Sequence, residues 1–130
     1  MLNRRSLLRG LLSTPAVVVI PRVRAAEAGR SLLIQESQVA GTQFYAWSQI
    51  RHSLQSGDVL ILRRNPYNAY DRRAVEIWRG EDMLGHLPTE ENVAVSQMMD
   101  RGERLVAELS RVVDAVNPWR RLRVCVRLVV

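Results

Sequence analysis

The sequence predicts a mainly β fold, a small barrel of about six strands with one or two short helices. Short apolar or alternating runs recur along the chain, turn-forming residues separate them, and a helix pattern occurs once. The 130 residues are enough for one domain and too few for two. Short strands separated by turns are typical of a closed or partly open barrel, and closure removes exposed strand edges.

The first half of the domain supplies the first two strands. Residues 31–41 alternate loosely and predict a strand, and residues 43–47 form an aromatic cluster in or beside a loop. A turn at residues 55–58, where Gly57 can adopt positive φ, precedes a strand over residues 59–64. A loop is then expected from Asn65 to Asp71, because Pro lacks a backbone donor and Asn and Asp favour turns.

The next three elements are a hairpin and a helix. Residues 74–79 and 83–87 predict strands joined by a turn at 80–82. Thr89 is the expected helix N-cap, and Gly102 the expected stop. Acids at positions 90 and 91 would favour the first turn, and Ala94, Val95, Met98 and Arg101 follow helical spacing.

Two further strands complete the predicted barrel. Residues 105–113 alternate, residues 117–119 form a turn, and residues 121–130 alternate clearly. The last strand should place one set of side chains inward and the other outward. The expected inner set is Leu122, Val124, Val126 and Leu128, and the expected outer set is Arg121, Arg123, Cys125 and Arg127.

The charge distribution argues for a local binding site instead of a generally basic surface. The sequence pI is about 10.9, and all 19 basic residues are arginine. Five of these precede residue 27, where there are no acids, so 14 arginines face all 13 acids in the rest of the chain. The domain itself is therefore nearly neutral, and any nucleic-acid interaction must depend on particular residues.

Residues 1–28 have the pattern of a bacterial signal peptide, which leaves residues 29–130 as the domain. Two adjacent arginines, Arg4 and Arg5, precede an apolar stretch of about ten residues, roughly half the length of a membrane-spanning helix. The run 3–9 resembles a twin-arginine signal, so we expect the export machinery as a partner and a periplasmic or exported protein. The alternative is a segment that stays attached, with a cytoplasmic or inner-membrane-tethered domain.

The densest group of chemically distinctive residues lies between positions 63 and 74. It places four arginines, two tyrosines and two asparagines around one loop. Arginine can contact phosphate, tyrosine can stack on an unpaired base, and asparagine can hydrogen-bond a base edge or a sugar hydroxyl. From residue types alone, a polar turn with solvated arginines and packed tyrosines is the favoured interpretation.

Two spaced motifs in this region resemble the HIRAN domain family. The first is Gly57-Asp58 with the apolar run that follows, continued by Arg64-Asn65-Pro66-x-Asn68-x-Tyr70-Asp71-x-x-Ala74-Val75. The second is Leu84-Gly85-His86-Leu87-Pro88, which leads into the predicted helix. The similarity extends from about residue 33 to the C-terminus. It implies an OB-like or SH3-like barrel that captures single-stranded DNA ends bearing a free 3′-hydroxyl.

The resemblance also implies roles for particular residues. Phe44 and Tyr45 would stack on the terminal bases, and Asn68, Tyr70 and Asp71 would hold the terminal nucleotide and its hydroxyl. Further nucleic-acid contacts would come from His86, which would lie beside the strand, and from Arg64 and Arg72, which would meet phosphates.

Two positions depart from the family pattern, and each of the implied site residues has a structural alternative. Gln43 replaces an arginine before the aromatic pair, and Arg73 replaces a common asparagine. Asp71 could instead brace the loop, and Tyr70, Phe44 and Tyr45 could pack in the barrel. His86 and the three tryptophans are expected mainly to be structural.

The sequence contains no catalytic motif, and we expect a binding module with no cofactor. It has no phosphate-binding loop of the usual ATPase type and no metalloprotease or hydrolase signature. Two histidines and the single Cys125 do not form an ordinary zinc site, so no metal is expected. The alternative function is an exported envelope module that binds a protein or a ligand and has lost DNA binding.

Overall fold

The computed structural model describes residues 30–130, so the signal peptide and twin-arginine predictions lie outside the described residues. Six strands form one sheet in which every pair is antiparallel. The strands are β1 (Ser31–Gln38), β2 (Val59–Asn65), β3 (Ala74–Arg79), β4 (Asp82–His86), β5 (Leu105–Val112) and β6 (Leu122–Val129). The mainly β, six-stranded fold predicted from the sequence is thus confirmed.

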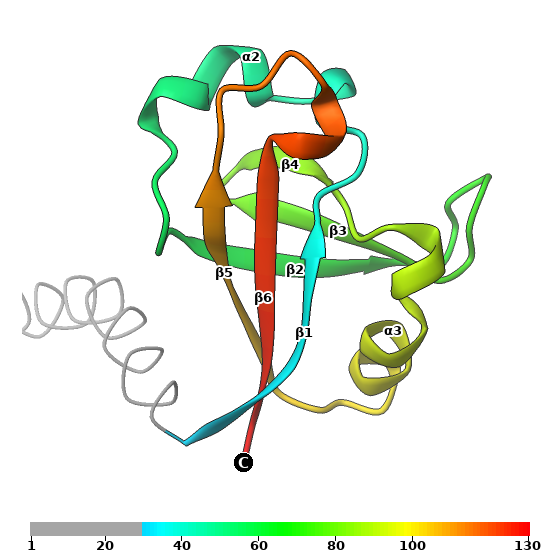
Figure 1. The fold of residues 1–130 in the computed structure, drawn as a ribbon. Helices are drawn as coiled ribbons and strands as arrows, with labels where there is room; N and C mark the ends of the chain where they lie inside the picture. Colours follow the sequence, from blue (N-terminus) through cyan, green and yellow to red (C-terminus); the bar gives the residue numbers. More distant parts are fainter. Residues whose placement is uncertain (1–29) are drawn as a thin grey trace, which may run out of the picture.

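The sheet curls until its two ends meet. Its strand order is β1-β6-β5-β2-β3-β4, which leaves β1 and β4 at opposite ends (Figure 1). Directly after β1, the N–H of Ala40 donates to the carbonyl of His86 at 2.8 Å, and the N–H of His86 donates back at 2.9 Å. This single bridge joins the two ends, so the sheet forms a small barrel of the OB-like kind.

Alternation of side chains along the strands fills the barrel interior. In β6, Leu122, Val124 and Val126 are fully buried, as the sequence predicts. They pack with Leu60 of β2, Ile77 of β3 and apolar residues from the other strands in one cluster. Because burial of apolar area is the main favourable term in folding, this cluster provides most of the stability of the fold.

The outer row of β6 differs from the prediction in two residues. Arg121 precedes the strand, and its guanidinium donates to the carbonyl of Ala115 at 2.9 Å, so it fastens the β5–β6 loop. Cys125 is buried even though it belongs to the outer row. It pairs in register with Glu36 of β1 on one side and Glu108 of β5 on the other, and a central strand is covered more than an edge strand.

The expected helix starts later than the sequence suggested. Thr89 to Glu91 form a 3₁₀ turn, and α3 runs from Val93 to Asp100, with Asn92 at its N-cap position. The buried face also differs in part from the expected one: Val95 and Ser96 are buried, whereas Ala94 and Arg101 are exposed. Thr89 makes no capping hydrogen bond within the described chain.

Other short helical segments lie in the connections. The helix α2 (Trp47–Ile50) follows a 3₁₀ turn at Thr42–Phe44 and continues into another at Arg51–Ser53. A fourth 3₁₀ turn, Pro118–Arg120, lies in the β5–β6 loop near the first one (Figure 1). Among residues 30–130, no helix has the length and apolar character needed to span a membrane.

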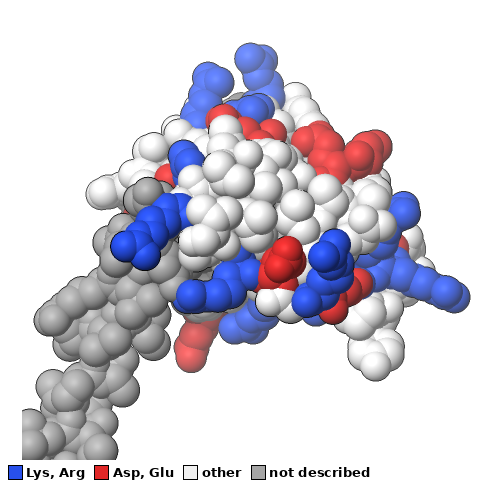
Figure 2. Space-filling model, turned by 90° about the horizontal axis from the view of Figure 1, so that it is seen from below, with Lys and Arg blue, Asp and Glu red and all other residues white. Residues whose placement is uncertain are grey.

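Charged residues are mixed on the face seen from below. In Figure 2, arginines and acids alternate around an uncharged central area. This face therefore has no extended basic surface, in agreement with the near-neutral charge of the domain. A nucleic-acid site has to be sought among particular loops instead.

Candidate nucleic-acid interface

An open pocket of about 440 Å³ lies where the ends of the sheet meet. It is bordered by the segment after β1, the β2–β3 loop, the end of β4 and the 3₁₀ turn before β6. Six of the eight residues predicted to bind nucleic acid line it: Phe44, Tyr45, Asn68, Tyr70, Asp71 and His86. The bridge between Ala40 and His86 brings these distant parts of the sequence together.

Asparagine side chains determine the shape of the β2–β3 loop. The Oδ1 of Asn68 accepts from the backbone N–H of Tyr70 at 2.9 Å and of Asp71 at 3.1 Å. The Oδ1 of Asn65 accepts from the N–H of Tyr67 at 3.2 Å. Such side-chain turns replace backbone hydrogen bonds and hold a loop without a sheet partner. Asn68 therefore has a structural role in the loop as well as a place in the pocket lining.

The same loop presents Tyr70 to solvent. Its side chain is 97% exposed, so it does not pack in the barrel, which was the structural alternative for this residue. Tyr67, in the same loop, is 93% exposed but is not part of the pocket lining. A large exposed ring beside a pocket offers a face for stacking.

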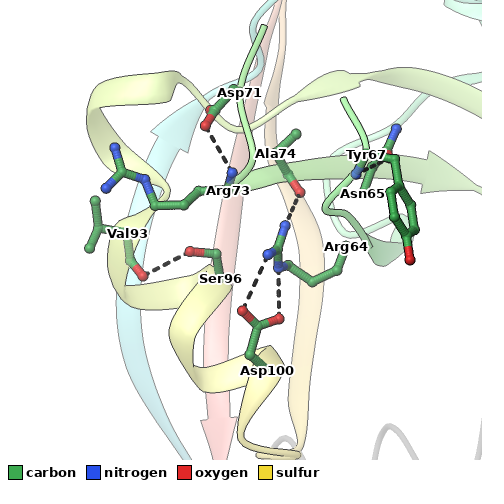
Figure 3. A network of polar contacts seen from close by, with 9 residues as sticks. All are labelled: Arg64, Asn65, Tyr67, Asp71, Arg73, Ala74, Val93, Ser96 and Asp100. Atoms are coloured by element: carbon green, nitrogen blue, oxygen red, sulfur yellow. Dashed lines mark hydrogen bonds and ion pairs between the residues drawn. The ribbon is translucent and has the colours of Figure 1, made fainter. Parts of the chain in front are cut away.

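Asp71 is fixed by two hydrogen bonds from different parts of the chain. Its Oδ1 accepts from the backbone N–H of Arg73 at 2.9 Å, a contact visible in Figure 3. Its Oδ2 accepts from the Nδ2 of Asn92 at 2.7 Å. Asn92 is completely buried, so its side chain is a rigid support. The carboxylate of Asp71 thus braces the loop, which was the structural alternative for this residue, and it also lines the pocket.

Phe44 and Tyr45 contribute two further aromatic rings to the pocket lining. Gly41 has φ +79, in the left-handed region, which turns the chain from β1 into the segment that carries Phe44 and Tyr45. Phe44 is 75% exposed, and neither ring is buried in the core. Tyr45 meets His86 edge to face, with 5.6 Å between ring centroids.

His86 lines the pocket from the end of β4. Burial lowers the pKa of its imidazole, and the nearby Glu76 and Asp71 carboxylates oppose this effect without reversing it. The ring is therefore mainly neutral at neutral pH. A neutral imidazole can donate one hydrogen bond and accept another, but it contributes no positive charge for a phosphate.

Arg64 and Arg72 lie outside the pocket lining. The guanidinium of Arg64 donates to both carboxylate oxygens of Asp100, at 2.9 and 3.2 Å, and to the carbonyl of Ala74 at 2.9 Å (Figure 3). Arg64 thus joins β2 and β3 to the end of α3, and its hydrogen bonds to Asp100 hold the pKa of that carboxyl below its usual value. Arg72 is exposed on the loop.

Trp119 lines the pocket, although the sequence suggested that it packs in the interior. It comes from the turn before β6 and is 45% exposed, in contrast to the buried Trp47. Its position in Asn117-Pro118-Trp119 is the one signal in the sequence, because a large aromatic residue in a turn is poorly placed for a core. Among residues 30–130, no cluster of side chains has the composition of a metal site.

A match to a known protein family agrees with the fold and with the residues that line the pocket. The HIRAN domain family matches residues 33–130, which cover most of the chain, including all the elements that build the pocket. The protein belongs to the HIRAN domain family. The HIRAN domain is a nucleic-acid-binding fold. The two motifs that resemble this family lie in the loop that carries Tyr70 and Asp71 and in the strand that ends at His86.

Solved structures show the same HIRAN fold. A crystal structure of a protein from Lactobacillus plantarum aligns with a TM-score of 0.66 and 20% identity, over 75% of this chain and 94% of that one. The crystal structure of the HIRAN domain of human HLTF aligns with a TM-score of 0.59 and 20% identity, over 77% of this chain and 79% of that one. A comparison with curated protein sequences found no significant match.

Proposed function

We propose that this HIRAN domain binds single-stranded DNA ends that carry a free 3′-hydroxyl, and that it acts as a binding module and not as an enzyme. The observation that carries the proposal is the pocket itself. It combines exposed aromatic rings from three segments of the chain with the fixed carboxylate of Asp71 and the side chain of Asn68. That combination suits one unstacked nucleotide, whose base needs a ring face and whose sugar needs an acceptor.

The aromatic rings account for recognition of a single strand. Phe44, Tyr45, Tyr70 and Trp119 all reach the pocket, and bases in a duplex are not free to stack on them. Stacking of one base on an aromatic side chain contributes about 1–3 kcal/mol and requires no particular base. We therefore expect weak sequence preference and a strong preference for unpaired ends.

The pocket acids account for the choice of end. Asp71 and Glu90 line the pocket, and none of the lining residues is an arginine. Each Asp71 oxygen already accepts one hydrogen bond, and a carboxylate offers about four acceptor sites, so capacity for a hydroxyl donor remains. A terminal phosphate would meet two carboxylates instead, and like charges repel at short range.

The loop provides a matched pair of variants that tests the proposal. We predict that Tyr70→Ala weakens binding of a single strand by about 5- to 100-fold, which corresponds to loss of one stacking contact. Tyr67→Ala removes an equally exposed tyrosine from the same loop but outside the pocket, and it should bind as the native protein does. Fluorescence anisotropy in low salt measures both. Equal affinities for the two variants would contradict the assignment of the pocket.

The alternative proposal is that the pocket binds an uncharged ligand or a protein partner in the cell envelope instead of DNA. The absence of arginine from the lining favours it, because phosphate contacts within the pocket are missing. If the folded protein binds no DNA in low salt, this function replaces the first. A dependence of binding on salt concentration, which contacts to the phosphates of a strand cause and an uncharged ligand lacks, separates the two.

We further propose that the protein is exported by the twin-arginine route. The proposal is supported by Arg4 and Arg5 ahead of the short apolar stretch. A reporter fused behind residues 1–30 should appear outside the cytoplasm, and Arg4→Lys with Arg5→Lys should retain it inside. Export that persists in the double variant would exclude this route.

A further inference from the structure

A second pocket, of about 330 Å³, is lined by other residues of the turn before β6. Its polar lining consists of Gln38, Arg111, Asn117 and Arg120, and small apolar residues of the β5–β6 loop complete it. No acidic side chain lines it. Asp71 and Glu90 do line the first pocket, which we call the aromatic pocket because Phe44, Tyr45, Tyr70 and Trp119 line it. The lining of the second pocket is therefore polar and positively charged.

The two arginines have no charge partner within residues 30–130. Neighbouring arginines are engaged: Arg123 donates to Glu36 at 3.0 Å, and Arg51 pairs with Asp114 at 3.3 Å. Arg111 lies opposite Arg123 in the β5–β6 register, and like charges in that position disfavour the sheet. Glu36 balances Arg123 but leaves Arg111 unbalanced, and Arg120 is exposed in the turn.

The loop between these arginines is held in place. The guanidinium of Arg121 donates to the carbonyls of Ala115 at 2.9 Å and Val116 at 3.4 Å. The Oδ1 of Asn117 accepts from the N–H of Trp119 at 3.1 Å, and the hydroxyl of Thr42 donates to the carbonyl of Pro118 at 3.1 Å. The positions of the pocket backbone are thus set before any ligand binds, which reduces the entropic cost of binding.

Gln38, which also lines this pocket, has a side-chain oxygen without a hydrogen-bond partner. The Oε1 of Gln38 is buried and makes no hydrogen bond within the described chain. Buried polar atoms are usually satisfied, because an unpaired one loses its hydration without compensation. The amide of Gln38 is thus a polar group of a lining residue that the described chain leaves partly unsatisfied.

The same two segments line both pockets. The exit from β1 contributes Gln38 to this pocket and Ala40 to the aromatic one, and the turn contributes Arg120 here and Trp119 there. We propose that the Arg111–Arg120 pocket binds a backbone phosphate of the same strand whose end occupies the aromatic pocket. This role rests on the proposed function. It supplies the phosphate contact that the aromatic pocket lacks.

Inorganic phosphate tests the anion site without DNA. In two-dimensional NMR spectra of the guanidinium groups, phosphate should shift the Nε–Hε signals of Arg111 and Arg120 saturably. Arg111→Gln should abolish the shift of Arg120, whereas Arg101→Gln, which removes an exposed charge at the end of α3, should not change it. No shift, or equal small shifts of all exposed arginines, would overturn the proposal. That result would not depend on whether the protein binds DNA.

Strand length then tests the connection to the aromatic pocket. Single strands of increasing length with a free 3′-hydroxyl should gain affinity at the length that reaches the arginines. Arg111→Gln with Arg120→Gln should remove this gain and lower the salt slope of the longer strand by about 0.7 for one phosphate. Loss of binding in Tyr70→Ala with an unchanged salt slope in the arginine variant would refute the phosphate site and retain the proposed function. Absence of DNA binding in the native protein would refute both the proposed function and the link between the pockets.

Discussion

Asp71 and Asn92 show how a site residue depends on a buried neighbour. The sequence motif indicates Asp71, because the residue belongs to a recognisable loop pattern. Nothing in the sequence indicates Asn92, which lies 21 positions later and contacts Asp71 at 2.7 Å only because the barrel brings the start of α3 against the loop. Such a support depends on tertiary contacts and is visible only in the folded structure.

Because His86 is partly buried, we expect the free energy of unfolding to depend on pH near neutrality. Its pKa is below 6.5 in the folded protein because of burial, so the unfolded chain binds more protons just below pH 6.5. The free energy of unfolding should therefore decrease as the pH falls through 6.5, by at most about 1.4 kcal/mol per pH unit for one proton. Urea denaturation between pH 7.5 and 5.5 measures this.

A substitution of His86 provides the control for that experiment. His86→Gln should flatten the pH dependence, because it removes the group whose pKa burial lowers. The window lies above the range in which Glu36 and Asp100 titrate, because their partners lower the pKa of both carboxyls. A slope that persists in His86→Gln would assign the effect to other groups.

Among the elements, strand alternation was predictable and helix placement was not. Residues 122–128 alternate so regularly that β6 and its buried face follow directly from the sequence. The start of α3 did not, because the sequence offers Thr89 as a cap while the fold uses a 3₁₀ turn there and begins the helix at Val93. Capping preferences are weak compared with the packing of a helix against a sheet.

Closure of the barrel depends on Gly85. A Cβ atom at this position would collide with the carbonyl oxygen of Ala40, next to the bridge between Ala40 and His86. We predict that Gly85→Ala destabilises the protein by at least about 2 kcal/mol, because backbone atoms cannot make room for a methyl group as side chains can. Thermal or chemical denaturation measures the change.

Gly80 offers a comparison for Gly85. It also has positive φ, at +60, but an added Cβ would meet no atom within 4 Å. Gly80→Ala should therefore cost only about 1 kcal/mol, from the left-handed backbone alone. Equal costs for the two substitutions would show that the close contact at Ala40 does not limit the fold.

At the scale of the whole molecule, closure of the sheet explains why the site could be predicted only in part. The motifs near Tyr70 and His86 are evident in the sequence, and so is the aromatic pair. Their meeting in one pocket requires the ends of β1 and β4 to join, and the addition of Trp119 requires the β5–β6 loop to fold over the same end. These are long-range contacts that local patterns do not encode.

The fold also determines which arginines have partners within the protein. Arg64 donates hydrogen bonds to Asp100 and to the carbonyl of Ala74, whereas Arg111 and Arg120 have no acidic partner in the described chain and line the second pocket. The sequence does not distinguish these arginines, since each lies in a polar or alternating segment. The fold therefore decides which positive charges are available to a ligand.

Discrimination between strand ends decides whether the pocket captures a free 3′-hydroxyl. The purified protein should be titrated in low salt with a labelled single strand that ends in a 3′-hydroxyl and with the same strand ending in a 3′-phosphate. We predict tighter binding of the hydroxyl end by at least about tenfold, since the phosphate would be placed against Asp71 and Glu90. Equal affinity for both ends, or tighter binding of the phosphate, would contradict end capture by this pocket.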